Sequence, residues 1–238
     1  MATISDNLQR VHARIQQACI QSGRSFDAVE LLAVSKTFGV ESVQDAYHAG
    51  QRAFGENYVQ EGVDKILAAQ ALGLTDVQWH CIGPVQSNKT RLVAAHFDWV
   101  HTVDRLKIAE RLSAQRAQDL PPLNVCVQVN VDGGANKAGV APDELLALAQ
   151  GVAGLPRLRL RGVMCIPEPA PDFDAAVAVF AQAHALFDTL QQAGLSVDTL
   201  SMGMSDDLEA AVAAGSTLVR VGSAIFGKRP RKVNDATA

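Results

Sequence analysis

The sequence predicts an α/β protein built as one (β/α)₈ barrel domain over residues 1–238, with an extra helix before the first strand. Short apolar runs alternate with segments of helical periodicity along the chain, and the apolar runs number eight. No Gly-x-Gly-x-x-Gly follows the first run, although a dinucleotide-binding open sheet would place one there. Barrels of this type commonly take about 250 residues, which suits a chain of 238 residues that is 48% hydrophobic and 19% charged.

The first predicted element is an amphipathic helix within residues 1–23. Its apolar side chains recur every three or four residues, at Ile4, Leu8, Val11, Ile15 and Cys19. The eight strands are expected at residues 30–35, 52–55, 77–82, 99–102, 124–131, 158–164, 199–202 and 217–220. The helices between them are expected at residues 40–49, 59–71, 88–95, 105–118, 142–151, 174–193 and 207–214. Because each strand precedes a helix, we expect parallel pairing through right-handed crossovers, and the count of eight favours a closed barrel.

Composition and charge argue against several classes of protein. The net charge of −4 does not suit a surface that neutralises phosphate backbones, so nucleic acid is not an expected partner. The four cysteines form no Cys-x-x-Cys pair and have no clustered His, which predicts reduced, mostly buried thiols and no metal site. The opening residues lack the apolar core of a signal peptide, and no apolar run reaches the roughly 18 residues of a membrane span. We therefore expect a cytoplasmic protein without membrane contacts, and a flexible, solvated tail at residues 228–238.

Lys36 is the first candidate for chemistry, because the functional groups of such barrels lie where strands run into βα loops. It follows directly on the apolar run that ends in Ala33-Val34-Ser35. Burial beside apolar neighbours lowers the pKa of a lysine and makes its amine a nucleophile that suits a Schiff base with an aldehyde. The alternative is a structural lysine that binds strand-end carbonyls or a carboxylate.

The loops after the seventh and eighth strands predict a phosphate site. Phosphate sites of this barrel lie there, beside a short extra helix, which we expect to begin at Gly222. Ser205 offers a hydroxyl donor, and Gly222 lets the backbone approach a ligand closely. The alternative is that the serine is an ordinary helix N-cap. A lysine and a phosphate site at one mouth predict a phosphorylated aldehyde or a sugar phosphate as the ligand.

Arg220, at the end of the eighth strand, would face the ring of such a ligand. A guanidinium can only donate hydrogen bonds, so it would leave a pyridine nitrogen neutral and make the ring a weak electron sink. The alternative for Arg220 is a salt bridge to Glu56 or Asp206.

Three further polar residues at strand ends also have two interpretations each. Asn57 would contact the ligand ring or cap the next helix. His80 would point into the mouth or be a satisfied core histidine, since no second His stands at metal spacing. Lys137, in a loop of small residues, would meet the ligand on its way in or out, or be simply solvated.

Taken together, these segments resemble the pyridoxal phosphate homeostasis protein family along essentially the whole chain. The matching segments are residues 33–37 (AVSKT), 54–58 (FGENY), 79–80 (WH) with 82–83 (IG), 86–89 (QSNK), 128–130 (QVN), 201–205 (SMGMS), 219–222 (VRVG) and 225–227 (IFG). The resemblance implies that Lys36 carries pyridoxal 5′-phosphate (PLP) covalently, as a Schiff base. It also implies that Ser205, Gly222 and Ser223 hold the phosphate and that Arg220 meets the pyridine nitrogen.

The same resemblance implies that Asn57, His80 and Met202 line the ring of the cofactor. Two departures from the family pattern stand out. Cys81 lies where the family often has an aromatic or apolar residue, and residues 135–137 (ANK) stand where the family commonly has Glu and Ser nearby. The second departure leaves open only the role of the loop that holds Lys137.

The function that the resemblance implies is intracellular PLP (vitamin B6) homeostasis, on a barrel like the N-terminal domain of alanine racemases. Such a protein buffers or delivers PLP, has PLP-requiring apo-enzymes as possible partners and influences amino-acid and keto-acid balance. We expect a monomer that is not an enzyme and has no catalytic residue. The alternative is a PLP-dependent racemase or decarboxylase with weak activity. Racemases of this type add a C-terminal β-domain with a tyrosine base, whereas this chain has only Tyr47 and Tyr58. A sugar-phosphate enzyme remains a third hypothesis if Lys36 is not modified.

Overall fold

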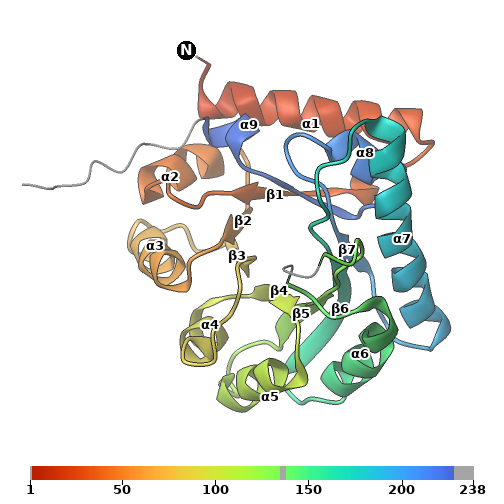
Figure 1. The fold of residues 1–238 in the computed structure, drawn as a ribbon. Coiled ribbons are helices and arrows are strands. Elements are labelled where there is room, and N and C mark those ends of the chain that lie inside the picture. The colour runs from red at the N-terminus through yellow and green to blue at the C-terminus, as the bar shows by residue number, and fades with distance from the viewer. Residues whose placement is uncertain (1, 135–137, 228–238) are drawn as a thin grey trace, which may run out of the picture.

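A closed ring of parallel strands forms the centre of the molecule (Figure 1). The computed structural model describes residues 2–134 and 138–227. Within these residues, eight strands pair in chain order, and the eighth pairs with the first to close the barrel. The strands are β1 (Glu30–Val34), β2 (Ala53–Glu56), β3 (Gln78–Cys81), β4 (Trp99–Val103), β5 (Leu123–Gln128), β6 (Leu158–Met164), β7 (Thr199–Ser201) and β8 (Leu218–Val221). The predicted fold class is confirmed.

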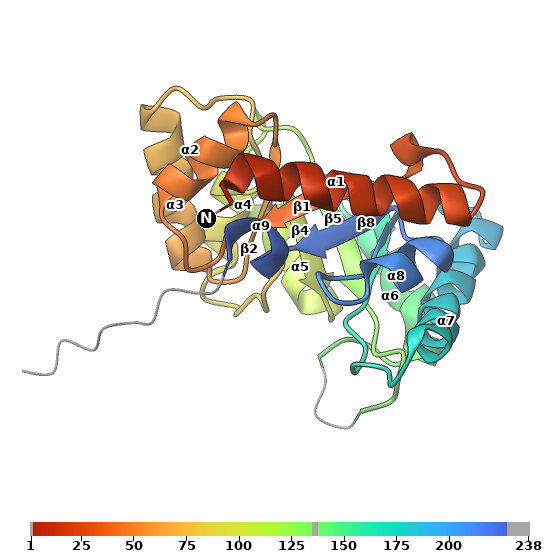
Figure 2. The same ribbon diagram turned by 90° about the horizontal axis from the view of Figure 1, so that it is seen from above.

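Helices surround the ring of strands (Figure 1). They are α1 (Ile4–Gln21), α2 (Val40–His48), α3 (Val59–Ala71), α4 (Thr90–His96), α5 (Leu106–Gln115), α6 (Leu145–Ala153), α7 (Phe173–Gln192), α8 (Leu208–Ala213) and α9 (Ser223–Phe226), with 3₁₀ turns at Phe26–Ala28 and Pro142–Glu144. The predicted extra helix is α1, which begins at a capping box formed by Thr3 and Asp6. It packs across α2, α8 and α9, over the seam where β1 meets β8 (Figure 2).

Element boundaries differ from the predicted ones mainly where tertiary contacts end an element. The helix expected at residues 105–118 ends at Gln115, because Arg116 adopts an extended backbone. Its buried guanidinium donates to the carbonyl oxygens of Ala94 and Phe97, both at 2.8 Å, and so satisfies the end of α4. The fifth strand, expected to reach residue 131, ends at Gln128 and continues only as an isolated bridge between Val129 and Val140.

Side chains on each strand alternate between the barrel interior and the helix layer. On β1, Leu31 and Ala33 pack into the large apolar cluster that lies between strands and helices. Leu32 and Val34, between and after them, belong to a separate cluster inside the barrel. This alternation decides which residues at the strand ends reach the mouth of the barrel.

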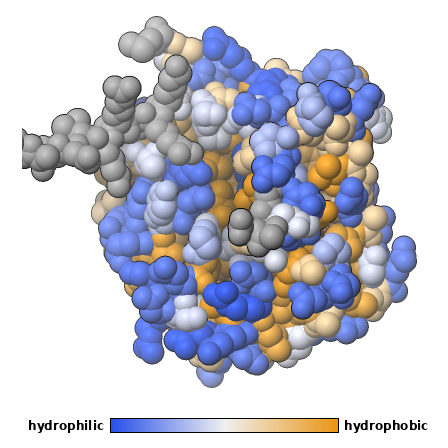
Figure 3. Space-filling view, in the orientation of Figure 1, coloured by the Kyte–Doolittle hydropathy of each residue, from blue (hydrophilic) through white to orange (hydrophobic). Residues whose placement is uncertain are grey.

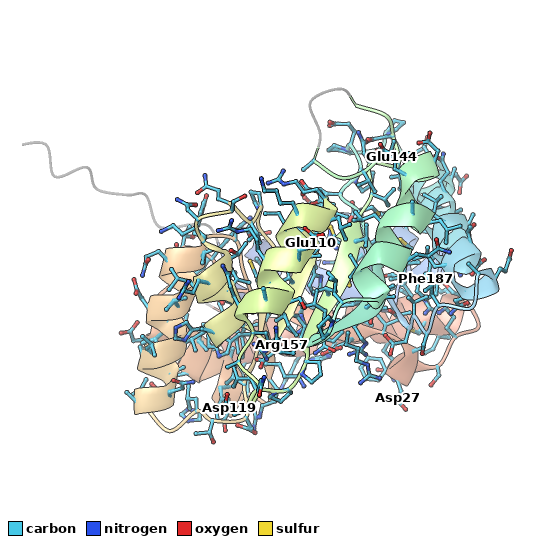
Figure 4. The ribbon with its side chains drawn as sticks, turned by 90° about the horizontal axis from the view of Figure 1, so that it is seen from below. Asp27, Glu110, Asp119, Glu144, Arg157 and Phe187 are labelled. Atoms are coloured by element: carbon cyan, nitrogen blue, oxygen red, sulfur yellow. The ribbon has the colours of Figure 1, made fainter. Side chains whose placement is uncertain are left out.

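Charged side chains lie on the outer surface of the molecule. Figure 4 labels four of them, Asp27, Glu110, Asp119 and Glu144, and all four are exposed. The four cysteines are buried and free, as predicted. In the part of the chain that the structure describes, no helix has the length and apolar character needed to cross a bilayer. The same residues contain no group of three side chains suited to hold a metal ion.

Candidate functional site

A cavity of about 320 Å³ opens where the strands end and the βα loops begin. It brings together six of the eight predicted site residues, namely Lys36, Asn57, Ser205, Arg220, Gly222 and Ser223. The apolar part of its wall comes from Val34, Phe38, Ile82 and Ile166. Figure 3 shows the face seen in Figure 1, on which apolar residues lie between polar ones. The cavity therefore combines an apolar wall with convergent polar groups, as small-ligand sites generally do.

Lys36 enters the cavity because of its place in the β1 alternation. It has the same parity as Leu32 and Val34, whose side chains lie inside the barrel. The side chain of Lys36 is half-buried beside the apolar groups of Val34 and Phe38. The next residue, Thr37, adopts a left-handed backbone with φ of 70°, a conformation that is costly for a threonine.

Two hydroxyl groups and a glycine form one end of the cavity. The hydroxyls of Ser205 and Ser223 lie 3.3 Å apart, although they come from loops after different strands. Gly222 precedes α9, and a Cβ at this position would lie 3.2 Å from the carbonyl oxygen of Val34. Helix α9 has only four residues, so its dipole contributes little, and hydroxyl and backbone N–H groups are the main donors. These groups suit the oxygens of a phosphate.

Arg220 is a buried cation whose acceptors are neutral. Its side chain donates to Ser201 Oγ at 2.8 Å and to the carbonyl oxygen of Cys165 at 2.9 Å, and the residue is 4% exposed. Burial lowers the pKa of the guanidinium. Among the described residues, no carboxylate lies within ion-pair distance of it, so the alternative of a salt bridge to Glu56 or Asp206 is wrong. Glu56 binds Lys65 instead.

Asn57 lies on the cavity wall, and its side-chain oxygen is buried without a hydrogen-bond partner among the described residues. The alternative of a helix cap is wrong, because Tyr58 is the N-cap of α3. A buried amide oxygen without a partner is uncommon in native proteins and is expected where a ligand completes a site.

His80 does not reach the cavity wall. His80 lies on β3, two residues before Ile82 of the cavity wall. It therefore lies one layer deeper in the barrel, where it is fully buried. Its Nδ1 lies 2.9 Å from His101 Nε2, and its ring stacks on Trp99 with centroids 5.0 Å apart. Burial and, secondarily, Arg161 lower the pKa of His80 to about 3. The predicted place of His80 beside the ligand is corrected to that of a neutral core histidine.

Met202 also lies outside the cavity wall. Leu200 on β7 faces the helix layer, and Met202, two residues later, packs fully buried into the same apolar cluster. The predicted contact with a ligand ring is corrected for this reason. Gly203, whose φ of 92° is available to glycine, turns the chain after Met202, and the next residue, Met204, lies on the wall.

Two polar residues of the interior were missed by sequence reasoning, namely His101 and Ser201. They link Arg220 to His80, since Ser201 Oγ also lies 2.9 Å from His101 Nδ1. Strand alternation was the available signal, because His101 and Ser201 lie on predicted strands at inward positions.

Two residues singled out in the sequence, Lys137 and Cys81, are not among the described residues of the cavity wall. Lys137 lies outside the described residues. Cys81, the departure from the family pattern, packs in the helix-facing cluster, where burial raises the pKa of its thiol to about 12. Its effect is therefore on packing.

Several known proteins are similar to this chain in sequence and in fold. The family model "Alanine racemase, N-terminal domain" matches residues 4–230. A pyridoxal phosphate homeostasis protein of Pseudomonas aeruginosa is 56% identical over 229 residues, which cover 96% of this chain and 97% of that protein. The PLP-bound structure of PipY from Synechococcus elongatus PCC7942 is 37% identical, with a TM-score of 0.80 over 94% of this chain and 100% of PipY. Alanine racemase from Corynebacterium glutamicum is 15% identical, with a TM-score of 0.64 over 94% of this chain and 61% of that one, a likeness that shows the fold alone.

Proposed function

The chain belongs to the pyridoxal phosphate homeostasis protein family, and we propose that it carries PLP as a Schiff base on Lys36 and serves intracellular vitamin B6 homeostasis. In this role it buffers or delivers the cofactor and thereby influences amino-acid and keto-acid balance. The observation that carries the proposal is one cavity that holds a lysine, a buried guanidinium with neutral acceptors and a pair of hydroxyls. A phosphorylated aldehyde matches all three groups.

The residues of the cavity fit PLP by their chemistry. Ser205, Ser223 and the backbone at Gly222 would hold the phosphate, because hydroxyl and N–H groups donate to its oxygens. Arg220 would donate to the pyridine nitrogen, and Asn57 would meet the ring through its buried side-chain oxygen or amide. When bound, PLP supplies an electrophilic aldehyde to the amine of Lys36. The apolar wall would exclude water from this bond.

We expect binding rather than catalysis. The guanidinium of Arg220 can only donate a hydrogen bond to the ring nitrogen and cannot accept one from a protonated nitrogen. The nitrogen would therefore stay neutral and the ring a weak electron sink. A racemase or decarboxylase also needs a proton-transfer group beside the reacting carbon. Of the two tyrosines, Tyr47 bonds Asp76 on the outer surface, and Tyr58 is 57% exposed outside the cavity wall. A PLP-dependent enzyme with weak activity is the alternative that turnover assays with amino acids would detect.

PLP-requiring apo-enzymes are the expected recipients of the cofactor, in the cytoplasm. The protein is expected to act as a monomer, which light scattering after size exclusion would test.

The decisive experiment is covalent trapping of PLP on the purified protein. We expect an absorbance band of the Schiff base, which borohydride fixes on the peptide that contains Lys36. Lys36→Ala should abolish the band. Its free energy of unfolding should stay within about 1 kcal/mol of the wild-type value, since truncating one residue at the mouth removes little core. Lys107→Ala, on the exposed side of α5, is the matched control and should keep full labelling. A full covalent band in Lys36→Ala would refute the assignment, and a wild type that stays unmodified would favour the sugar-phosphate hypothesis.

A further inference from the structure

A buried cluster of charged side chains lies behind the end of β1, on the side opposite the cavity. Lys65 of α3 and Glu56 of β2 form an ion pair with Nζ–Oε1 of 2.5 Å, and their side chains are 4% and 0% exposed. Glu61, one helical turn before Lys65, lies 3.4 Å from the same ammonium. We call Glu56, Glu61 and Lys65 the clamp. Burying the charges of Glu56 and Lys65 is costly, so their position calls for an explanation beyond stability.

The clamp contacts the backbone immediately before and after Lys36. Lys65 Nζ donates to the carbonyl oxygen of Ser35 at 2.9 Å. Glu61 Oε1 accepts the backbone N–H of Thr37 at 2.5 Å. The two peptide groups that flank the Cα of Lys36 are therefore held by a single ammonium–carboxylate cluster.

Strand alternation separates the clamp from the cavity. Ser35 has the parity of Ala33 and faces the helix layer, where its hydroxyl donates to Glu56 Oε1 at 2.6 Å. Lys36 has the opposite parity and faces the cavity. The clamp thus contacts the main chain on one side of the strand, while the side chain of Lys36 lies on the other side, in the cavity wall.

Two further features indicate that this arrangement is built to hold the main chain in place. Thr37 keeps a φ of 70°, a strained conformation that persists only where surrounding contacts enforce it. The hydrogen bond that its backbone N–H donates to Glu61 is such a contact. Gly62 lets α3 approach closely, because a Cβ there would lie 3.2 Å from Glu56 Cβ and 2.6 Å from the ring of Phe97.

We propose that Glu56, Glu61 and Lys65 are positioning residues that fix the backbone on both sides of Lys36 and thereby direct its amine toward the aldehyde of PLP. The proposal rests on the proposed function, because it assumes that Lys36 is the residue that PLP modifies. A lysine side chain has four rotatable bonds, so its reach is defined only if its Cα is fixed. A purely structural pair would instead stabilise the barrel without affecting the rate of covalent bond formation.

The test measures the rate of PLP attachment to Lys36 together with the melting temperature of the unliganded protein. Glu61→Ala removes the acceptor of the Thr37 N–H, and Glu61→Gln keeps an amide oxygen at the same place. Glu61 is one-third exposed, and alanine suits a helix, so both variants should fold. Gln60→Ala is the matched control, because it breaks an exposed hydrogen bond to Asp64 on the same helix without touching β1.

We expect Glu61→Ala to slow attachment about ten-fold, because a small displacement of a reacting group is costly. Glu61→Gln should recover most of the rate, and Gln60→Ala should match the wild type. The inference is overturned if Glu61→Ala attaches PLP at the wild-type rate. A wild type that attaches no PLP to Lys36 refutes the proposed function instead, so the two failures are distinguishable.

A second variant decides the question if Glu61→Ala does not fold. Thr37→Gly adopts a positive φ without strain and should therefore keep the fold, while it loosens the backbone between Lys36 and the clamp. Slower attachment in Thr37→Gly at an unchanged melting temperature supports the inference, and an unchanged rate contradicts it.

Discussion

Two arginines at opposite ends of the barrel interior have contrasting surroundings. Arg161, on β6 near the amino end of the barrel, binds both oxygens of Asp198, at 2.8 and 2.9 Å, and covers the ring of Trp99 at 4.3 Å. Arg220, on β8 at the carboxyl end, is more deeply buried, and within the described residues it donates only to a hydroxyl and a carbonyl oxygen. The first cation is thus paired with a carboxylate of the protein, whereas the acceptors of the second among the described residues are neutral.

The contrast agrees with the division of labour in (β/α)₈ barrels, where the amino end provides stability and the carboxyl end provides function. At the amino end, Arg52 also pairs with Asp76 at 2.8 Å. At the carboxyl end, Asn57 keeps a buried oxygen without a partner among the described residues. Of the buried side-chain oxygens without a partner among the described residues, that of Asn57 is the one on the cavity wall.

The strongest test of this contrast exchanges each arginine for methionine. Arg220→Met should weaken PLP binding about 10- to 100-fold, because a hydrogen bond that involves a charged group contributes roughly 1.5–3 kcal/mol. Its unliganded stability should change by less than about 1 kcal/mol, since two lost hydrogen bonds are offset by the removal of a buried charge. Absorbance titration with PLP and urea unfolding measure the two effects. A large loss of stability with unchanged affinity would make Arg220 a structural residue like Arg161.

His80, in the barrel interior between these two ends, predicts that the stability of the protein depends on pH. The pKa of His80 is about 3 in the folded protein, because of burial and then the positive Arg161, against about 6.5 in an unfolded chain. The folded state therefore binds fewer protons, so this stabilisation is complete above pH 6.5 and is lost as the pH falls toward 3. Between pH 7 and pH 5, His80 should lower the free energy of unfolding by roughly 2 kcal/mol. Urea unfolding at both pH values should show a smaller loss for His80→Asn, and an equal loss would contradict the assignment.

The smallest expected effect is that of Arg161→Met. It should lower the free energy of unfolding by about 1–2 kcal/mol, through loss of the cation–π contact and of a partly exposed ion pair. PLP affinity should stay at the wild-type value, because Arg161 lies away from the cavity wall. Absorbance titration with PLP and urea unfolding measure these two effects. Weakened PLP binding would show that the two ends of the barrel are coupled.

The fold and most of the cavity wall could be predicted from the sequence. Hydrophobic periodicity is a local property, so it located all eight strands and the extra helix α1. The rule that βα loops carry function then selected Lys36, Ser205 and Gly222, which the structure places on one wall. Their binding roles stay predictions until PLP is trapped.

Met202 and His80 show where this reasoning stopped. Met202 ends a predicted strand and His80 lies within one, but a pleated strand sends successive side chains to opposite faces, and Met202 falls on the helix-facing side. His80 faces inward but lies one layer too deep. Applying the alternation to each strand end would have excluded Met202 and selected Ser201.

The sequence alone determined the order of strands and helices and the place of a lysine directly after the first strand, because these depend on neighbours along the chain. The closed barrel was inferred from the count of eight strands. Only the tertiary structure decided which partners the polar groups have. Lys65 meets the carbonyl oxygen of Ser35 across 30 residues, and Arg220 meets that of Cys165 across 55. Such contacts depend on barrel closure and helix packing, which place groups distant in sequence within hydrogen-bond reach and leave others for a ligand.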